Sequence, residues 1–177
     1  MPPIEINGQT VSNVVVNGQS VDEITANGQT VFTAIPDSEV SRDPDEDSLS
    51  DSGTRRGIVI NPNTNLVQID ATISGNTDGL TQVGVSDSSN NVLASVTGSF
   101  TAGDTVVLVA SLSAGSDYAV WANAEGNSYT LGFDNVASFP YTSTDVDIVG
   151  GTQGDGSGGW QTANDPSNIL TIGAHTA

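Results

Sequence analysis

The chain has 177 residues, of which 21 are Asp or Glu, three are Arg and none is Lys, so its formal net charge is -18 at pH 7. This charge argues against nucleic acid and anionic membranes as partners, because affinity for phosphate groups depends on Lys and Arg. The absence of Cys excludes disulfides, thiolate nucleophiles and Cys-type zinc sites. The acidity suits concentrated salt, where the Debye length falls to about 3 Å, and indicates a halophilic setting, the alternative being an acidic mesophilic protein.

Residues 1–35 contain a ten-residue repeat, visible as INGQTV, VNGQSV and ANGQTV. The Asn-Gly pairs favour two-residue turns, which predicts three small hairpins. The predicted opposing pairs are Ile4 with Val11, Val14 with Val21, and Ile24 with Val31.

Hairpins of this size bury little apolar surface alone, so we predict a small meander or solenoid that serves in oligomerisation or docking. The residues expected to make these contacts are Ile4, Ile6, Val11, Val14, Val16, Val21, Ile24 and Val31. The alternative is a meander that packs on the rest of its own chain.

The composition changes between Pro36 and Thr54, where seven of the 21 acidic residues accompany two prolines. This pattern predicts an acidic linker over residues 36–56. Asp43, Asp45 and Asp47 alternate as at the start of an EF-hand loop, but Pro44 and the missing glycine argue against a calcium site. We predict no metal site and no cofactor.

Residues 57–177 show apolar side chains with a period of two, separated by Gly, Asn, Asp and Ser. One inward row is Val67, Ile69, Ala71 and Ile73, and a second is Val106, Leu108, Ala110 and Leu112. Strands are predicted at 58–61, 66–74, 80–86, 92–97, 105–112, 118–124, 128–133, 145–149 and 168–173. The sequence therefore predicts an all-β domain, an antiparallel β-sandwich of jelly-roll-like type.

The ionisable residues do not form a catalytic pattern, and we expect no enzymatic activity and no catalytic residues. His175 lies close to the end of the chain, in a segment expected to fray. Asp145 and Asp147 alternate along one predicted strand, a spacing more typical of solvated surface than of a glycosidase pair.

Aromatic residues offer a better indication of binding, since all but Phe32 lie in the predicted sandwich. Alternation places Tyr118 and Val120 on the inward face of their strand and Trp121 on the other face. Exposed rings beside Asn, Asp and Gln stack on sugar rings. Trp121, Tyr141 and Trp160 are therefore predicted to bind a glycan, the alternative being that both tryptophans are core or subunit contacts.

Two segments resemble viral proteins. The N-terminal repeat resembles short β-repeats of the form I-x-x-NG-x-x-V in tailed-phage virion proteins, and SFPYTSTDVDIVGG, Ser138 to Gly151, resembles segments of haloarchaeal-virus sandwich domains. The resemblance implies a structural protein of a haloarchaeal tailed virus, of the spike, turret or tail-fibre type. No functional residue is carried over from either likeness.

Such a protein is expected at the virion surface, after assembly in the host cytoplasm. The expected partners are its own copies, as a trimer or pentamer, other virion proteins, and a glycan or glycoprotein of the host envelope. One alternative is a purely architectural capsid or tail decoration protein without receptor binding. Another is a halophilic carbohydrate-binding module, against which the lack of signal-peptide character in the first residues counts.

Overall fold

The computed structural model describes residues 5–6, 9–10, 15–16, 19–20, 23–26, 29–33, 35–44, 47–52, 55–75, 77–124, 128–133, 138–154, 161–163 and 169–176. Side chains are described for 35–44, 55–75, 77–124, 128–130, 138–153 and 169–176. The chain divides into two compact units, the N-terminal unit Met1–Pro36 and the C-terminal unit Asp37–Ala177.

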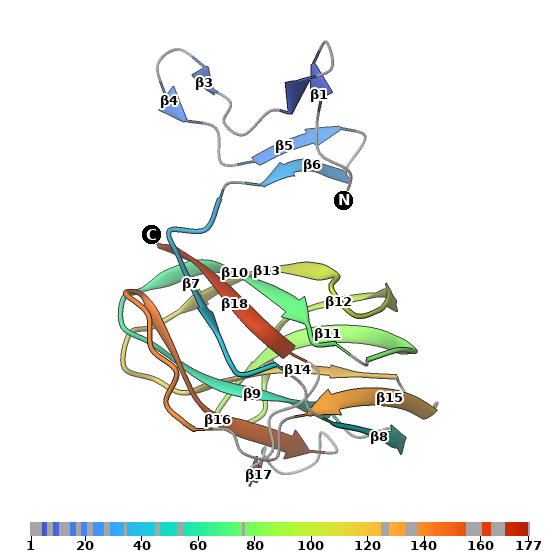
Figure 1. Cartoon of the computed structure of the whole chain (residues 1–177). Helices are drawn as coiled ribbons and strands as arrows, with labels where there is room; N and C mark the ends of the chain where they lie inside the picture. Colours follow the sequence, from blue (N-terminus) through green and yellow to red (C-terminus); the bar gives the residue numbers. More distant parts are fainter. Residues whose placement is uncertain are drawn as a thin grey trace. The chain divides into compact units, whose positions relative to one another are not determined.

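The N-terminal unit contains three antiparallel hairpins in its described residues (Figure 1). They pair β1 (Glu5–Ile6) with β2 (Gln9–Thr10), β3 (Val15–Val16) with β4 (Gln19–Ser20), and β5 (Glu23–Ala26) with β6 (Gln29–Thr33). The described strands form three separate two-stranded sheets, so the predicted meander is not formed by strand pairing between these hairpins.

The hairpin registers agree with the repeat in two of three cases. Glu5 pairs with Thr10 and Val15 with Ser20, the register predicted by two-residue closure, although the predicted pairs Ile4–Val11 and Val14–Val21 lie outside the described residues. The third prediction is wrong, because a bulge in the β5–β6 pair sets Ile24 opposite Phe32 instead of Val31.

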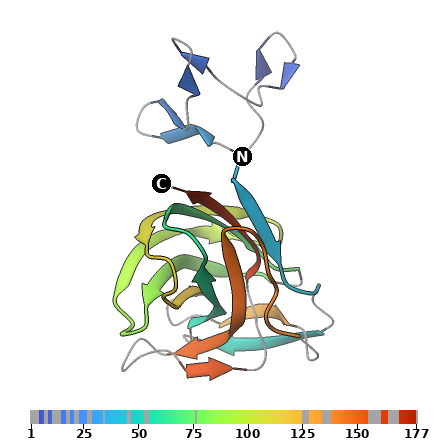
Figure 2. The same cartoon turned by 90° about the vertical axis from the view of Figure 1, so that its left-hand side faces the viewer.

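The C-terminal unit is an antiparallel β-sandwich, which confirms the predicted fold class. Its two sheets form the layers visible in Figure 1 and in the turned view of Figure 2. The four-stranded sheet has the order β13-β10-β18-β7, and the six-stranded sheet has the order β12-β11-β14-β9-β16-β17.

The strands of the four-stranded sheet are β7 (Ser38–Ser41), β10 (Leu66–Ile73), β13 (Thr105–Leu112) and β18 (Ile169–Thr176). Those of the six-stranded sheet are β9 (Arg55–Pro62), β11 (Leu80–Asp87), β12 (Val92–Phe100), β14 (Tyr118–Asn123), β16 (Val146–Gly154) and β17 (Gln161–Ala163). A further pair joins β8 (Asp47–Ser52) to β15 (Ser128–Phe133).

The core lies between the two sheets and is built from alternate residues of each strand. Val106, Leu108, Ala110 and Leu112 of β13 are buried as predicted. In β10 the buried row differs from the predicted one at its first residue. A bulge between Leu66 and Gln68 turns Leu66 inward and leaves Val67 exposed.

The predicted linker over residues 36–56 is wrong in two places. Ser38–Ser41 forms β7, which pairs with β18, and Asp47–Ser52 forms β8, which pairs with β15. Neither segment shows the alternation of apolar and polar residues by which a strand is predicted from sequence. Pairing with strands far along the chain determines their structure, so tertiary context overrides local composition.

The turn between β11 and β12 is stabilised by hydrogen bonds of Asp87. Asp87 Oδ1 accepts the backbone N–H groups of Ser89 and Asn91, and Asn91 Nδ2 donates to Asp87 Oδ2 (2.8 Å). The bonds from Asn91, with a smaller contribution from Ser89, lower the pKa of Asp87. Asn90 has a φ of 65°, a conformation that Asn tolerates.

Candidate functional site

Trp121 lies on the outer face of the six-stranded sheet, as its alternation predicts, but it is only 2% exposed. Its Nε1–H donates to Ser86 Oγ (2.8 Å), and the Arg55 guanidinium lies 3.9 Å from the ring centroid. The hydrogen bond and the cation–π contact hold the ring from the two strands beside it. The prediction of Trp121 as an exposed ring is therefore wrong.

Glycines on both neighbouring strands explain why this ring can be buried. Trp121 pairs with Gly84 on β11 and with Gly57 on β9. A Cβ on Gly84 would lie 2.5 Å from Trp121 Cζ2, so the ring occupies the space that a side chain would need. The two glycines are the signal in the sequence that sequence analysis missed, because a large ring commonly covers glycine in a sheet.

Tyr141 belongs to a different part of the unit. It forms an isolated bridge with Ile148 of β16, packs against the core, and contacts Phe139 edge-on at 5.5 Å between ring centroids. Its hydroxyl donates to Asp43 Oδ2 (2.6 Å) and accepts the N–H of Ser138 (3.0 Å). Burial, followed by the bond to Asp43, raises the pKa of Tyr141 above its usual 10.0.

The predicted glycan-binding residues therefore do not form one described surface. Trp121 packs on the outer face of the six-stranded sheet, whereas Tyr141 packs against the core. Trp160 lies outside the described residues. Both described rings already have intramolecular partners, which is the arrangement that the alternative interpretation anticipated for Trp121.

The predicted oligomerisation residues fall in two groups. Ile4, Val11, Val14 and Val21 lie outside the described residues. Ile6, Val16, Ile24 and Val31 lie in β1, β3, β5 and β6, whose side chains are not described. Their role in self-association stays a prediction.

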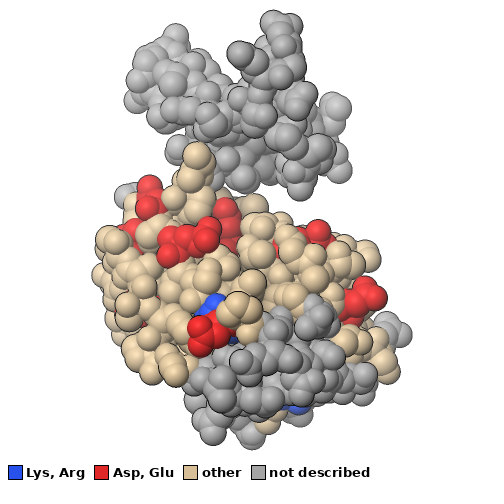
Figure 3. Space-filling view, in the orientation of Figure 1, with Lys and Arg blue, Asp and Glu red and all other residues tan. Residues whose placement is uncertain are grey.

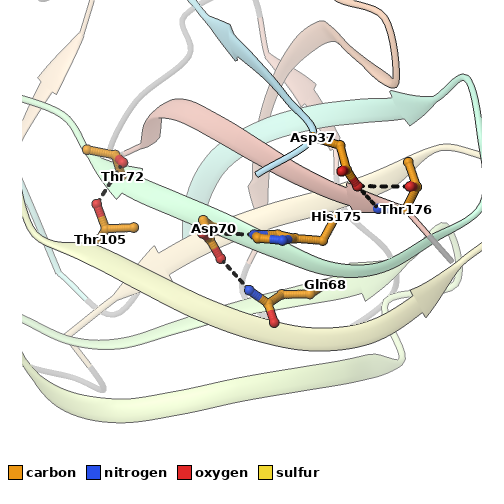
Figure 4. A network of polar contacts seen from close by, with 7 residues as sticks. All are labelled: Asp37, Gln68, Asp70, Thr72, Thr105, His175 and Thr176. Atoms are coloured by element: carbon orange, nitrogen blue, oxygen red, sulfur yellow. Dashed lines mark hydrogen bonds and ion pairs between the residues drawn. The ribbon is translucent and has the colours of Figure 1, made fainter. Parts of the chain in front are cut away.

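The outer face of the four-stranded sheet carries a row of polar contacts across β13, β10 and β18, shown in Figure 4. Gln68 Nε2 donates to Asp70 Oδ1 (2.9 Å), and His175 Nε2 lies 3.0 Å from Asp70 Oδ2. The hydroxyls of Thr72 and Thr105 lie 3.0 Å apart on paired strands. We call these five residues the polar face.

His175 is 8% exposed, so the prediction that it lies in a fraying segment is wrong. The reason is topological, because β18 lies between β10 and β7 and has a pairing partner on each side. Both carboxylate oxygens of Asp70 have a partner in this network. The arrangement links strands across the sheet and presents amide and hydroxyl groups beside it.

Asp37 ties the start of the C-terminal unit to its last strand. Its Oδ2 accepts the backbone N–H of Thr176 (2.7 Å) and the Thr176 hydroxyl (2.8 Å). These hydrogen bonds, with a smaller contribution from the positive character of His175, lower the pKa of Asp37 below its ordinary 3.8.

All three arginines of the chain make contacts within the C-terminal unit. Arg42 is buried and donates from Nε to the carbonyl of Ile169 (2.9 Å), Arg56 Nη1 donates to Gln153 Oε1 (2.5 Å), and Arg55 stacks on Trp121. In the view of Figure 3, carboxylate residues are scattered over the face of this unit and only small areas of Arg are visible. The positive groups therefore serve structure inside an acidic surface.

Acidic and amide side chains also meet at the start of β16. Asn63 Nδ2 donates to Asp147 Oδ1 (3.1 Å), and the buried Asp145 accepts from Thr64 Oγ1 (3.3 Å). Asp145 is 8% exposed, so its prediction as a solvated surface residue is wrong. Among the described residues, no group of three or more His, Cys, Asp or Glu is placed to hold a metal ion.

Comparison with known proteins adds no relative: no protein-family model, curated protein or solved structure matches the chain. In the part of the chain that the structure describes, no helix has the length and apolar character needed to cross a membrane.

Proposed function

We propose that this protein is a structural subunit of a virion surface projection, which assembles through the N-terminal unit and displays the C-terminal unit. The observation that carries the proposal is the contrast between the two units. The C-terminal unit has a two-sheet core of its own, whereas the described strands before Pro36 form three separate two-stranded hairpins. Isolated hairpins are marginally stable, so repeated copies gain from stacking with other chains.

The virion setting is supported by the sequence. The repeated Asn-Gly hairpins resemble repeats of tailed-virus proteins, and the register of the first two hairpins agrees with that repeat. A net charge of -18 is suited to a particle that stays dispersed in concentrated salt.

An architectural role, without receptor binding, is the form of this function that the geometry favours. The observation behind it is the engagement of the two described candidate rings, since Trp121 is buried and Tyr141 donates to Asp43. A ring that stacks on a sugar needs an exposed face. Host attachment is the second candidate, and the polar face supports it, because its amide, carboxylate and hydroxyl groups match the hydroxyls of a glycan.

Self-association is tested on the full chain by light scattering in molar KCl. Replacement of the eight predicted apolar repeat residues by Ser is expected to lower the mass, because it removes the apolar rows that we assign to assembly. The matched control replaces Gln9, Gln19 and Gln29 by Ser and is expected to keep the mass of the wild type. Equal masses for all three proteins would refute assembly through the repeat.

The virion location is tested by immunogold electron microscopy with an antibody against the C-terminal unit, applied to particles released from the cells that make the protein. Label on intact particles, lost when residues 1–36 are deleted, is the expected result. Label restricted to the cell, with none on particles, contradicts the proposal. A glycan array in molar salt distinguishes the host-attachment role from the purely architectural role. Glycan binding that is lost in the Gln68→Ala variant supports host attachment, and the absence of binding to any glycan supports the architectural role.

A further inference from the structure

The strand β12 forms one edge of the six-stranded sheet and pairs only with β11 among the described strands. It is nine residues long, Val92–Phe100, and carries no charged residue. Between Asp87 and Asp117 the only charged residue is Asp104. In a chain with a net charge of -18, this edge is an uncharged surface with one side of its backbone unpaired.

Of the other described edge strands, β7 and β17 have features that oppose strand pairing, whereas β13 is uncharged like β12. The edge strand β7 has four residues, includes the exposed Glu39, and is flanked by Asp37 and Arg42. The edge strand β17 has only three residues. Short length, charge and bulges are usual protections of a sheet edge, and β12 is long and uncharged, with bulges only near its two ends.

Apolar side chains are exposed along β12. Val92 is 44% exposed, Leu93 41% and Val96 38%. Two bulges in the β11–β12 pair interrupt the register near the two ends of β12 and leave Ala94 to Thr97 in regular register. An apolar, uncharged and unpaired edge is a surface suited to a partner strand.

We propose that the partner is a second copy of this chain, whose β12 pairs antiparallel with β12 of the first copy and continues the six-stranded sheet across a two-fold axis. The charge distribution supports this occupant. Two copies that each carry -18 repel one another wherever carboxylates meet, and β12 offers a contact to which neither copy brings a charge. Such a contact is isologous, so it closes at two copies.

The symmetry also restricts the register. A two-fold axis normal to the sheet keeps each face on its own side, so the residue on the axis lies opposite itself. With Val96 on the axis, Val96 lies opposite Val96 of the other copy, and Ser95 lies opposite Thr97, all within the segment that keeps regular register. A cross-strand pair of β-branched side chains such as Val96 with Val96 stabilises an antiparallel sheet.

This contact lies within the C-terminal unit and does not rest on the function proposed above. Assembly through the N-terminal repeat and pairing through β12 are changed by different substitutions, so each can fail without the other. A chain that uses both contacts forms assemblies with an even number of copies.

Substitutions at Val96 test the contact in the full chain by sedimentation in molar KCl. Val96→Asp places like charges opposite one another, so it is expected to reduce the mass at least twofold and to weaken pairing by about tenfold or more. Val109→Asp is the matched control, because it makes the same change at an exposed valine of β13, the uncharged edge strand of the other sheet, which the proposal leaves unpaired. Mixing Val96→Asp with Val96→Lys is expected to restore the mass, because the opposite charges then meet.

Amide hydrogen exchange on the wild-type chain tests the same contact without a substitution. Protection of amides within residues 92–100 is expected to rise with protein concentration, while that of β14 stays constant. Unchanged mass in Val96→Asp, an equal loss in Val109→Asp, no recovery on mixing, or concentration-independent exchange in β12 would each overturn the proposal.

Discussion

The Trp121 ring links three strands on the outer face of the six-stranded sheet, because it contacts groups on both strands that neighbour β14. Arg55 reaches it from β9, and Gly84 and Ser86 contact it from β11. A residue in this position contributes to stability through burial, one hydrogen bond and a cation–π contact. Its role belongs to folding, whichever ligand the protein binds.

Replacement of Trp121 by Ala is expected to lower the free energy of unfolding by about 3–5 kcal/mol, because it leaves a cavity and an unpaired Ser86 hydroxyl. Gly84→Ala is expected to cost about 1–3 kcal/mol, because the added methyl group meets the ring. The control is Val109→Ala, at a residue 65% exposed, with an expected change within about 0.5 kcal/mol. Urea unfolding in molar KCl measures all three. A fully stable Trp121→Ala variant would contradict the structural role.

Asp37 is expected to make the stability of the C-terminal unit depend on pH in the acidic range. Its pKa is lower in the folded chain than its ordinary 3.8, because Thr176 donates two hydrogen bonds to the carboxylate. A lowered folded-state pKa contributes stability that is complete above the unfolded pKa and is lost as the pH falls through the folded pKa. The contribution is small, because Asp37 is exposed.

The Asp37→Ala variant is therefore expected to be less stable than the wild type at neutral pH, by less than about 1 kcal/mol. The difference is expected to shrink as the pH falls below about 4, where the carboxyl of the unfolded chain becomes protonated, and to be lost once the pH falls below the lower pKa of the folded chain. Urea unfolding at a series of pH values measures this, with Glu39→Ala, at an exposed acid of β7, as the control. A difference that stays constant into strong acid would show that the Asp37 charge contributes nothing.

At the scale of elements, β18 determines whether the four-stranded sheet exists. It lies between β10 and β7, and its Ile172 and Ala174 belong to the core. Loss of a central strand removes two sets of backbone hydrogen bonds together with a row of buried side chains.

Deletion of residues 171–177 is accordingly expected to unfold the C-terminal unit, whereas deletion of residues 1–36 is expected to leave its cooperative unfolding intact. Circular dichroism during thermal unfolding in molar KCl measures both variants. Ile172→Ala provides a milder variant, with an expected loss of about 2–5 kcal/mol. A cooperative transition in the chain without residues 171–177 would mean that β10 and β7 do not depend on β18.

The strands predicted from period-two alternation were the reliable part of the sequence analysis. All nine predicted ranges overlap observed strands, from β9 to β18, because each contains enough apolar residues to reveal its buried face. The strands β7 and β8 were not predictable in this way. Val40 is the only apolar residue of β7, and that strand forms because β18 offers it a pairing edge.

The candidate sites were less predictable than the fold, because burial depends on neighbours from other strands. Alternation gave the correct face for Trp121, but the space above Gly84 that receives the ring arises only when β11 and β14 are paired. Similarly, His175 was expected to fray, and the network around Asp70 forms because β18 is paired on both sides. Residue type and sequence position do not reveal either arrangement.

At the scale of the whole molecule, the net charge opposes folding and the proposed self-association. The net charge is -18, and the three arginines are engaged within the C-terminal unit. Repulsion among carboxylates opposes both compaction of one chain and approach of identical chains. Dissolved salt screens this repulsion.

The unfolding temperature and the assembled mass are therefore expected to rise together as KCl is increased from low to molar concentration. Thermal unfolding and light scattering measure the two quantities. Sucrose is the control, because it favours the compact state by exclusion from the surface but does not screen charge. If sucrose raises both quantities as much as KCl does, screening is not the cause.

The position of β18 also has a consequence for synthesis on the ribosome. β7 and β10 emerge long before residues 169–176, yet in the finished sheet they are joined only through β18. Until then the nascent chain carries the apolar row of Ile69, Ala71 and Ile73 without the strand that completes its sheet. Carboxylates of the residues already translated are expected to repel those of neighbouring nascent chains during this interval, to the extent that salt does not screen them, and so to oppose association of the exposed apolar rows.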